Sequence, residues 1–248
     1  MTKVGLSLLL LITTLNLLAQ DEDKPWEKTE VWEPVPPTVA PGTYVYATPP
    51  SDAIVLFDGK DLSQWQKPEQ KGNAGWTVED GQLIVNPGTG NIETRKAFGD
   101  IQLHIEWNAP VDEGKEGQGY SNSGVFLMGR YEVQVLNNYK NRTYSNGQAG
   151  SIYKQAIPLV NACRPPGEWQ AYDIIFTAPV FNSDGSLQSP ARVTVLHNGV
   201  LVQNNTEIKG PTVYIGEPSY VAHADKLPLR LQDHSDKVRF RNIWVREL

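Results

Sequence analysis

Hydrophobic and polar positions alternate with a period of two through most of this chain. Between residues 101 and 107, Ile, Leu, Ile and Trp alternate with Gln, His and Glu, and a similar alternation occupies residues 130–136. Successive side chains of a strand point to opposite faces, so each segment predicts a strand with one apolar face. From residue 54 onward, no segment has the i, i+3, i+4 and i+7 apolar spacing of a helix.

Turn signals separate these short segments. Asp58-Gly59, Asp80-Gly81, Asp184-Gly185 and Asn198-Gly199 are typical of hairpins and tight turns. Strands are predicted at residues 76–79, 82–85, 101–107, 124–127, 131–136, 169–177, 191–197 and 238–248. Many short strands without helices favour an all-β fold, a β-sandwich of two antiparallel sheets or a jelly roll, in one domain of about 200 residues.

The chain begins with a different pattern. Lys3 is followed by an apolar stretch over residues 4–18 and then by Ala19-Gln20, which predicts a secretory signal peptide at residues 1–19. The stretch is short for a membrane span, although a retained anchor is the alternative. No Cys lies near the cleavage region for lipid attachment. We therefore expect a periplasmic or secreted protein with no membrane span after processing.

Residues 20–50 form a proline-rich N-terminal arm, and residues 51–248 form the predicted sandwich domain. Proline fixes φ and lacks an amide donor, so the arm is expected to drape over the domain, with Trp26 and Trp32 indicating that part of it docks. The 248 residues carry a net charge of −6, which argues against nucleic acid as a partner. Cys163 is the single cysteine, so no intramolecular disulfide forms. We interpret it as a buried apolar residue rather than a nucleophile.

A row of polar residues marks the candidate active site. Arg130, Glu132 and Gln134 alternate with Tyr131, Val133 and Val135, so the three polar groups share one sheet face. Such a row is costly to bury unless the face is a wet groove that binds something. Asn122 and Ser123 precede the neighbouring strand and could hydrogen-bond a ligand or simply form a turn.

A second polar row lies near the C-terminus. If its strand alternates regularly, Arg230, Gln232 and His234 share one face, and the His234 imidazole could move a proton near neutral pH. The alternative is a histidine that closes a turn. Lys154 could reach the groove from a loop. Reserve candidates on the polar face of residues 101–107 are His104 and Glu106.

Four segments together resemble a known family. They are Leu56–Trp65 (LFDGKDLSQW), Asn122–Phe126 leading into Tyr131–Gln134, Gly167–Gln170 followed by a strand and Asn198–Val200, and Leu229–His234 leading into Val238–Val245. In this order and spacing they resemble the 3-keto-disaccharide hydrolase domain, also called 3-keto-glucoside lyase and hydratase. The resemblance covers residues 51–248.

This resemblance implies a concanavalin A-like jelly roll, usually exported, that acts on an oligosaccharide or glycoside whose C3 hydroxyl a separate oxidoreductase has oxidised. The ketone acidifies the C2 hydrogen, so one base can remove it and expel the C1 substituent, and water then adds. Glu132 and His234 are the candidate base and acid, and Arg130 could stabilise enolate charge. The expected substrate-binding residues are Gln134, Asn122, Ser123, Lys154, Gln232, Glu106 and His104.

Several alternatives stay open. The domain could be a non-catalytic carbohydrate-binding sandwich, or a conventional glycoside hydrolase with Glu132 and Glu106 as its carboxylate pair. Glu132 could also form a bracing ion pair with Arg130 or Lys154. No cofactor is expected, because the four histidines lack zinc-ligand spacing. Residues 182–185 have the composition of a calcium loop without its later acidic ligands, and a structural cation such as calcium is left open.

Overall fold

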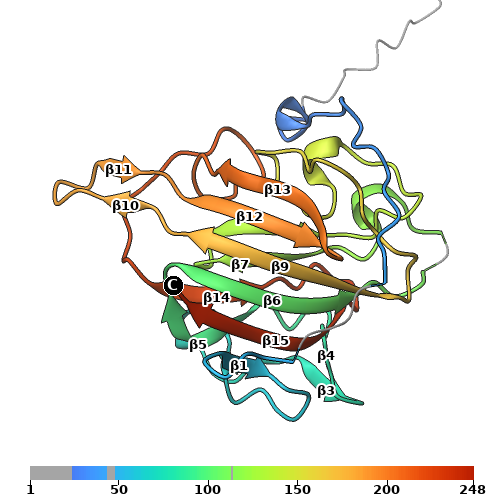
Figure 1. The fold of residues 1–248 in the computed structure, drawn as a ribbon, viewed down its shortest axis with the longest axis horizontal. Helices are drawn as coiled ribbons and strands as arrows, with labels where there is room; N and C mark the ends of the chain where they lie inside the picture. Colours follow the sequence, from blue (N-terminus) through green and yellow to red (C-terminus); the bar gives the residue numbers. More distant parts are fainter. Residues whose placement is uncertain (1–23, 44–47, 113) are drawn as a thin grey trace, which may run out of the picture.

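The computed structural model describes residues 24–43, 48–112 and 114–248, so the predicted signal peptide at 1–19 lies outside the described residues. Two antiparallel sheets pack face to face, and the domain is the all-β, concanavalin A-like jelly roll that the sequence predicts (Figure 1). Four short 3-10 helices occur in the described ranges, at Glu27–Thr29, Pro68–Gln70, Gly117–Gly119 and Ser145–Gly147.

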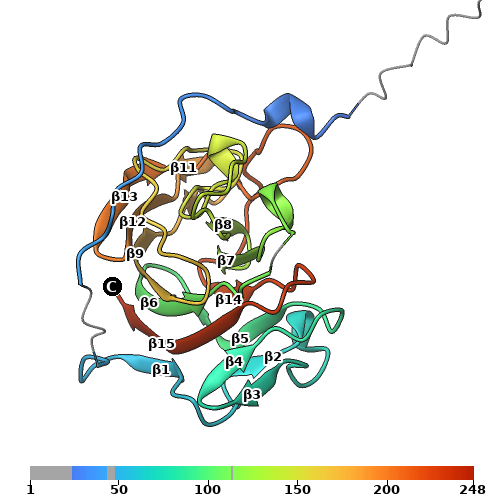
Figure 2. The same cartoon turned by 90° about the vertical axis from the view of Figure 1, so that its right-hand side faces the viewer.

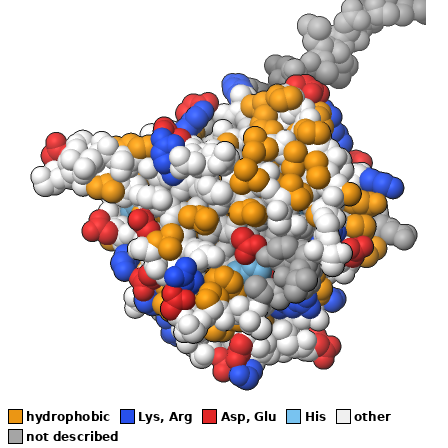
Figure 3. All heavy atoms as spheres, viewed as in Figure 1, with side chains coloured by type: hydrophobic (Ala, Val, Ile, Leu, Met, Phe, Trp, Pro, Cys, Tyr) orange, Lys and Arg blue, Asp and Glu red, His pale blue; other side chains and the backbone are white. Residues whose placement is uncertain are grey.

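The larger sheet has eight strands. Its order is β13 (Val200–Glu207), β12 (Arg192–His197), β9 (Trp169–Thr177), β6 (Ile101–Asn108), β15 (Arg239–Glu247), β4 (Gln82–Ile84) and β3 (Thr77–Glu79), with β1 (Ile54–Phe57) also paired to β15. The outside of this sheet faces the viewer in Figure 3, where hydrophobic side chains gather on part of the surface. Ile175 of β9 and Leu201 of β13 are among the exposed ones.

The smaller sheet has five strands and carries the candidate site. Its order is β2 (Trp65–Gln66), β5 (Ile92–Phe98), β14 (Leu227–Leu231), β7 (Ser123–Leu127) and β8 (Tyr131–Val135). A separate hairpin of β10 (Val180–Phe181) and β11 (Leu187–Ser189) projects from the body (Figure 1). The 182–186 turn that connects them is closed by Asp184, whose Oδ1 accepts from the Ser186 amide at 2.9 Å.

The core fills the space between the two sheets. From the larger sheet, Trp107, Tyr172 and Phe176 are fully buried, and from the smaller sheet Tyr131 and Val133 meet them. Alternation along β8 thus directs its odd-numbered residues inward and its even-numbered residues to the opposite face. The register of the polar row is fixed by this core, because a one-residue slip would move Glu132 and Gln134 into the apolar core in place of Tyr131 and Val133.

The N-terminal arm docks on the domain, as Trp26 and Trp32 indicated. The Val31 carbonyl accepts from the Ser145 amide at 2.6 Å, and the Val31 amide donates to Asn146 Oδ1 at 2.9 Å. Further along, Thr38 forms a parallel bridge with Asn161. Figure 2 shows the arm passing over the end of the sandwich and down its side. Within the described ranges, no helix is both long and apolar enough to cross a membrane.

Candidate active site

A cavity of about 280 Å³ opens on the outer face of the smaller sheet. It collects side chains from β7, β8, the end of β14 and two loops. Its lining residues are Asn122, Phe126, Glu132, Gln134, Tyr153, Thr212, Tyr214, Gln232 and His234. The two polar rows predicted from sequence therefore meet here, since Glu132 and Gln134 come from one row and Gln232 and His234 from the other.

Glycine at position 124 makes room for the Glu132 side chain. A Cβ added at Gly124 would collide with Glu132 Oε1 and would lie 2.8 Å from the Phe126 ring. The glycine belongs to β7, the strand beside β8, and it pairs with Gln134. The Ser-Gly-Val-Phe segment thus allows a carboxyl group to lie flat over the neighbouring strand.

Loops cover the free edge of β8 and form hydrogen bonds with the backbone of Glu132. The Glu132 amide donates to Thr212 Oγ1 at 3.0 Å, and the Thr212 amide donates to the Arg130 carbonyl at 2.8 Å. On the same edge, the Tyr153 amide donates to the Glu132 carbonyl at 3.3 Å and the Gln134 amide to the Ser151 carbonyl at 3.0 Å. Loops 150–156 and 209–216 therefore form walls of the cavity and also provide hydrogen-bond partners for the backbone groups of the edge strand β8.

The Glu132 carboxyl group is buried and lacks a cationic partner. Its residue is 4% exposed, and burial raises its pKa to about 8. No ion pair links it to Arg130 or Lys154, so the bracing role considered from sequence is not seen among the described residues. With the Gln134 amide oriented to satisfy its neighbours, its nitrogen lies 3.1 Å from Glu132 Oε1 and 2.9 Å from the Ser123 carbonyl. A carboxyl group in this setting is a stronger base than a solvated one.

Tyr153 is a second titratable group in the cavity. Burial raises its pKa to about 12, and the nearby Glu132 carboxylate adds to the shift. Its hydroxyl lies 2.7 Å from the Tyr144 hydroxyl. Tyr153 is therefore a neutral phenol that can donate or accept a hydrogen bond at the cavity wall.

His234 and Gln232 reach the cavity from the chain that follows β14. The Gln232 amide donates to the Gly124 carbonyl at 3.1 Å, which extends the β14–β7 pairing, and the Gln232 Oε1 atom is buried without a partner. His234 is exposed on the open side. Asp233 does not orient its imidazole. Its Oδ2 accepts from the Gly88 and Gly90 amides at 2.8 and 2.9 Å, so it anchors the loop that presents His234.

Asn122 and Ser123 differ in their surroundings. Asn122 lines the cavity, and its amide nitrogen Nδ2 donates to the Gln118 carbonyl at 2.9 Å. Ser123 is fully buried, and its hydroxyl donates to the Gln232 carbonyl at 2.7 Å. Ser123 thus ties β7 to the chain after β14 and is not in the cavity lining, in contrast to the predicted contact with substrate.

Lys154 lies beside the cavity and contacts the arm and loop 209–216 rather than pairing with Glu132. Its φ is 59°, and Nζ donates to the carbonyls of Trp26 at 2.5 Å and Tyr214 at 3.0 Å. The ammonium also lies 4.7 Å from the centroid of the Tyr214 ring. The preceding Tyr153 lines the cavity, whereas Lys154 is not among its lining residues. Lys154 therefore supports the wall formed by Tyr214.

Arg130 also lies outside the Glu132 cavity. It closes the turn between β7 and β8, where its amide donates to the Leu127 carbonyl at 3.0 Å, and its side chain lines a neighbouring cavity of about 570 Å³. The shared face predicted from alternation is correct, but this face carries two cavities. Arg130 belongs to the second.

His104 and Glu106 are buried on the larger sheet, so their prediction as groove residues is wrong. His104 Nδ1 lies 2.7 Å from Asp173 Oδ1, and Glu106 accepts from Arg241 Nε at 2.6 Å and from Asn242 Nδ2 at 2.8 Å. These partners raise the pKa of His104 to about 9, against the opposing effect of burial. Alternation could not distinguish a solvated face from one whose charges neutralise each other.

The position of Glu106 also removes the two-carboxylate arrangement with Glu132. The two residues face outward from different sheets, and packed sheets are separated by about 10 Å before either side chain is counted. A conventional glycosidase pair lies about 5–9.5 Å apart across one bond. Among the described residues that line the cavity, Glu132 is the only carboxylate.

Four cavity residues were not assigned to the site by sequence reasoning: Phe126, Tyr153, Thr212 and Tyr214. Phe126 lies in the Asn122–Phe126 segment that resembles the family, and Tyr153 is adjacent to Lys154. Neighbouring candidate residues could therefore have indicated both of them. Thr212 and Tyr214 belong to loop 209–216, which has no periodicity. Trp26 of the arm stacks on Tyr214, with ring centroids 6.1 Å apart and an interplanar angle of 13°.

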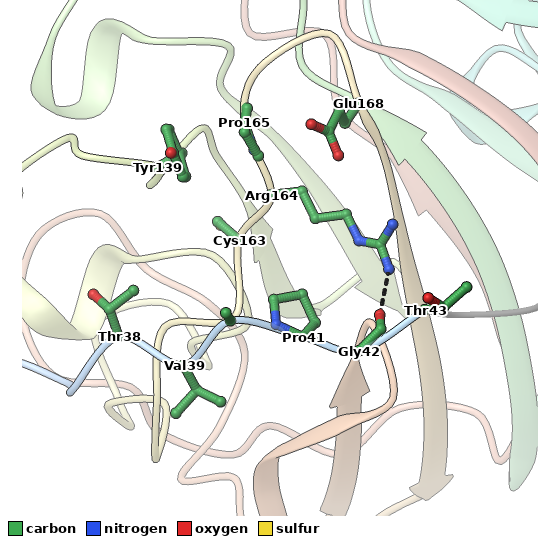
Figure 4. Close-up of a pocket in the computed structure, with 11 residues that line it drawn as sticks. Thr38, Val39, Pro41, Gly42, Thr43, Tyr139, Cys163, Arg164, Pro165 and Glu168 are labelled. Atoms are coloured by element: carbon green, nitrogen blue, oxygen red, sulfur yellow. Dashed lines mark hydrogen bonds between the residues drawn. The ribbon is translucent and has the colours of Figure 1, made fainter.

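A further cavity of about 400 Å³ lies between the arm and the body (Figure 4). Arg164 lines it and donates from Nη2 to the Gly42 carbonyl at 3.0 Å, which fastens the arm. Cys163 also lines it, but burial raises the pKa of the thiol to about 12. The thiolate needed for nucleophilic chemistry is therefore scarce at neutral pH. In the ranges that the structure describes, no group of three or more His, Cys, Asp or Glu side chains is arranged to hold a metal ion.

Fold and site together define a class of protein. A jelly-roll sandwich with a cavity lined by amides, hydroxyls and aromatic rings around one carboxyl group has the features of a carbohydrate-active protein. The aromatic faces suit sugar rings, and the amides suit hydroxyl groups.

Comparison with known proteins gives the family. Residues 52–246 match the model of the 3-keto-alpha-glucoside-1,2-lyase-like domain, and the chain belongs to this family. A curated relative, the 3-keto-disaccharide hydrolase of Bacteroides thetaiotaomicron, is 24% identical over 235 residues, which cover 79% of this chain and 78% of the relative. The protein is thus a glycosyl hydrolase-like enzyme of that family.

Solved structures agree on the fold. A crystal structure of a candidate glycosyl hydrolase from Parabacteroides distasonis is 54% identical and covers 90% of this chain and 96% of its own, with a TM-score of 0.79. A second protein from the same organism, described in the same way, is 23% identical with a TM-score of 0.56, covering 79% of this chain and 94% of its own.

Proposed function

We propose that this enzyme cleaves the glycosidic bond of 3-keto-glycosides by elimination followed by addition of water, with net hydrolysis as the result. The observation that carries the proposal is the isolated, buried Glu132 carboxyl group in the cavity, with a pKa raised to about 8. The described lining of this cavity does not offer two carboxylates to flank a glycosidic bond, as conventional hydrolysis needs, whereas elimination needs only one strong base.

In the first step, the Glu132 carboxylate removes the proton from C2 of the sugar. The electron pair of the C2–H bond forms the C1=C2 double bond, and the C1–O bond to the leaving group breaks. The leaving oxygen takes a proton from His234, which lies on the open side of the cavity. The ring product is an enone, in which the new C1=C2 double bond is conjugated with the C3 ketone.

Amide and hydroxyl groups are placed to stabilise the enolate that forms during proton removal. Gln232 and Tyr153 line the cavity and can donate from an amide and a neutral phenol, whereas the side-chain nitrogens of Asn122 and Gln134 already donate to protein oxygens. Fixed donors at a developing oxyanion are among the largest contributions to catalysis. The side-chain amides of Asn122, Gln134 and Gln232 also suit the remaining sugar hydroxyls.

In the second step, His234 takes a proton from water as the water oxygen adds to C1 of the enone, and C2 recovers a proton from Glu132. The products are the free 3-keto sugar and the released alcohol, so one water molecule is consumed overall and the enzyme is regenerated. Since the substrate must already contain a ketone at C3, a separate oxidoreductase has to act first. The predicted signal peptide supports a periplasmic or secreted location for this step.

The test is to mix the mature protein with a 3-keto-glucoside and with its unoxidised parent, and to follow enone absorbance and the released alcohol. We expect release from the ketone alone. Glu132→Gln should lose at least about 10³-fold in kcat, and His234→Ala a smaller factor of about 10². With Glu132 as the base, kcat/KM rises with pH up to about 8, whereas a falling profile would assign it as the acid.

Other outcomes would contradict the proposal in different ways. Binding of glycans without turnover of either substrate would indicate a carbohydrate-binding module. Cleavage of the unoxidised parent at a comparable rate would indicate a conventional hydrolase with a second carboxylate from elsewhere.

A further inference from the structure

The two polar rows that meet in the Glu132 cavity extend beyond it. Arg130 precedes Glu132 and Gln134 in the first row, and Arg230 precedes Gln232 and His234 in the second. Both arginines line the second cavity of about 570 Å³ on the same face of the smaller sheet. The two cavities are neighbours, because Arg230 pairs in register with Phe126, which lines the Glu132 cavity.

This second cavity has an excess of positive charge. Its described lining contains four cationic and two acidic side chains, namely Arg95, Arg130, Lys226 and Arg230 against Glu69 and Glu93. The whole chain, in contrast, has a net charge of −6. A cationic cavity on an acidic protein favours an anionic ligand.

The carboxylates of the cavity are already engaged. Glu93 is 4% exposed, and it accepts from Arg230 Nη2 at 3.2 Å and from the Glu69 amide at 3.0 Å. Glu69 itself pairs with Lys71, Oε2 to Nζ, at 2.5 Å. Neither carboxylate is therefore left to neutralise Arg130.

Two arginines have capacity to bind a ligand. The Arg230 guanidinium is engaged with Glu93 through Nη2, and the Arg130 guanidinium forms no ion pair with any described residue. Arg95 is instead committed to Ser63 and Gln66, where it donates to a backbone carbonyl and a side-chain oxygen. Lys226 pairs with Glu247, Nζ to Oε1, at 2.7 Å, so Arg130 and Arg230 are the cations that remain for a ligand. A guanidinium fork matches the two oxygens of a carboxylate.

The backbone around the cavity is also unusual. Glu69 and Gln70 are consecutive non-glycine residues with φ of 59° and 56°, and Met128 has φ of 54°. All three line the cavity. Left-handed conformations of such residues are costly and are concentrated at binding and active sites. At Met128 the conformation follows from the tight β7–β8 turn that it forms with Gly129, so of these three residues Glu69 and Gln70 are the ones whose backbone the hairpin does not explain.

We propose that the second cavity is a subsite for the leaving-group part of the substrate, and that it accepts a carboxylate-bearing group such as a uronic acid residue. This inference rests on the proposed function, because it assumes that the 3-keto sugar occupies the neighbouring Glu132 cavity. Arg130 and Arg230 bind the carboxylate, and a linked pair of sugar residues lies across the two cavities.

The first experiment measures binding without catalysis. Glucuronate and glucose are titrated separately into the mature protein by calorimetry at low and high salt. We expect glucuronate to bind at least about tenfold more tightly than glucose and to weaken with salt. Arg130→Gln should weaken glucuronate binding about tenfold. The control Arg192→Gln, which removes an exposed cation from β12 of the other sheet, should leave it unchanged.

Arg130 is the variant of choice because Arg230 neutralises the buried Glu93 and its loss would threaten folding. Thermal unfolding verifies that Arg130→Gln and Arg192→Gln are both folded. Equal binding of glucose and glucuronate, or equal effects of the two variants, would overturn the inference.

The second experiment separates this inference from the proposed function. It compares kcat/KM for two 3-keto-glucosides that differ in their leaving residue, glucuronate or glucose. A preference of about tenfold for the acidic substrate that Arg130→Gln removes would support the subsite. Turnover of both without preference would reject the subsite and leave the proposed function standing. With no turnover of either, the proposed function fails and the calorimetry alone decides the subsite.

Discussion

Glu132 combines a buried position with an ionisable group, and this has a consequence for stability. Its pKa is near 4.5 in an unfolded chain and about 8 in the folded protein, so folding favours the protonated form. Between these values the unfolded state loses its proton before the folded state does. The contribution of Glu132 to stability is therefore fully present below about pH 4.5 and is lost as the pH rises through 8.

Glu132→Gln should remove this pH dependence. We expect the variant to be as stable as the parent near pH 4.5 and more stable at pH 8.5, with about 5 kcal/mol as the upper limit of the gain. Urea unfolding at both pH values measures the difference. Glu79→Gln, which changes an exposed carboxylate on β3, is the matched control, and parallel curves for Glu132→Gln and the parent would contradict the shifted pKa.

Gly124 is the residue on which the carboxyl position depends. In Gly124→Ala, the new Cβ would collide with Glu132 Oε1 and the Phe126 ring. We expect a loss of about 1–3 kcal/mol in stability and about 10²-fold in kcat, because a small displacement of a catalytic group is costly. Activity assays and thermal unfolding measure both effects.

The control is Gly119→Ala, since a Cβ at Gly119 meets nothing within 4 Å. It should leave both activity and stability near those of the parent. Should Gly124→Ala keep full activity, Glu132 would not need its observed position.

At the scale of elements, the arm contacts a wall of the candidate active site through Trp26. Trp26 stacks on Tyr214, and Tyr214 lines the Glu132 cavity. Trp26→Ala should raise KM up to about tenfold, the equivalent of the 0.5–1.5 kcal/mol of an aromatic pair, while kcat changes little. Steady-state kinetics with a 3-keto-glucoside test this. The control is Val35→Ala, which changes an exposed residue of the arm. A Trp26→Ala variant with the parental KM would show that the arm docks on the domain without contributing to substrate binding.

At the scale of the whole molecule, the sandwich could be predicted because each strand carries its own signal. Alternation along residues 101–107 and 131–136 defines an apolar face in both cases. Alternation does not say what lies against the other face. On β8 that face is the cavity with Glu132, whereas on β6 it holds the buried His104 and Glu106, whose partners Asp173 and Arg241 are distant in sequence.

The candidate site was predictable to the same extent. Glu132, Gln134, Gln232 and His234 follow from local rows, but their meeting in one cavity depends on the pairing of β14 with β7. Tyr214 and Thr212 reach the cavity through a loop whose path is set by hydrogen bonds to β8. The sequence also could not show that Arg130 lines a different cavity from Glu132 and Gln134, because the two cavities are defined only once the strands of the smaller sheet are paired.

The covering of the β8 edge has a consequence for solubility. β8 is the last strand of its sheet, and an uncovered edge strand offers free amides and carbonyls to strands of other molecules. Loops 150–156 and 209–216 occupy these groups at Arg130, Glu132 and Gln134. The walls of the Glu132 cavity therefore also protect this edge strand from pairing with other molecules. Substitutions that loosen either loop to admit a larger substrate would expose a template for intermolecular β-pairing, so broader specificity and a lower tendency to aggregate are in conflict on this strand.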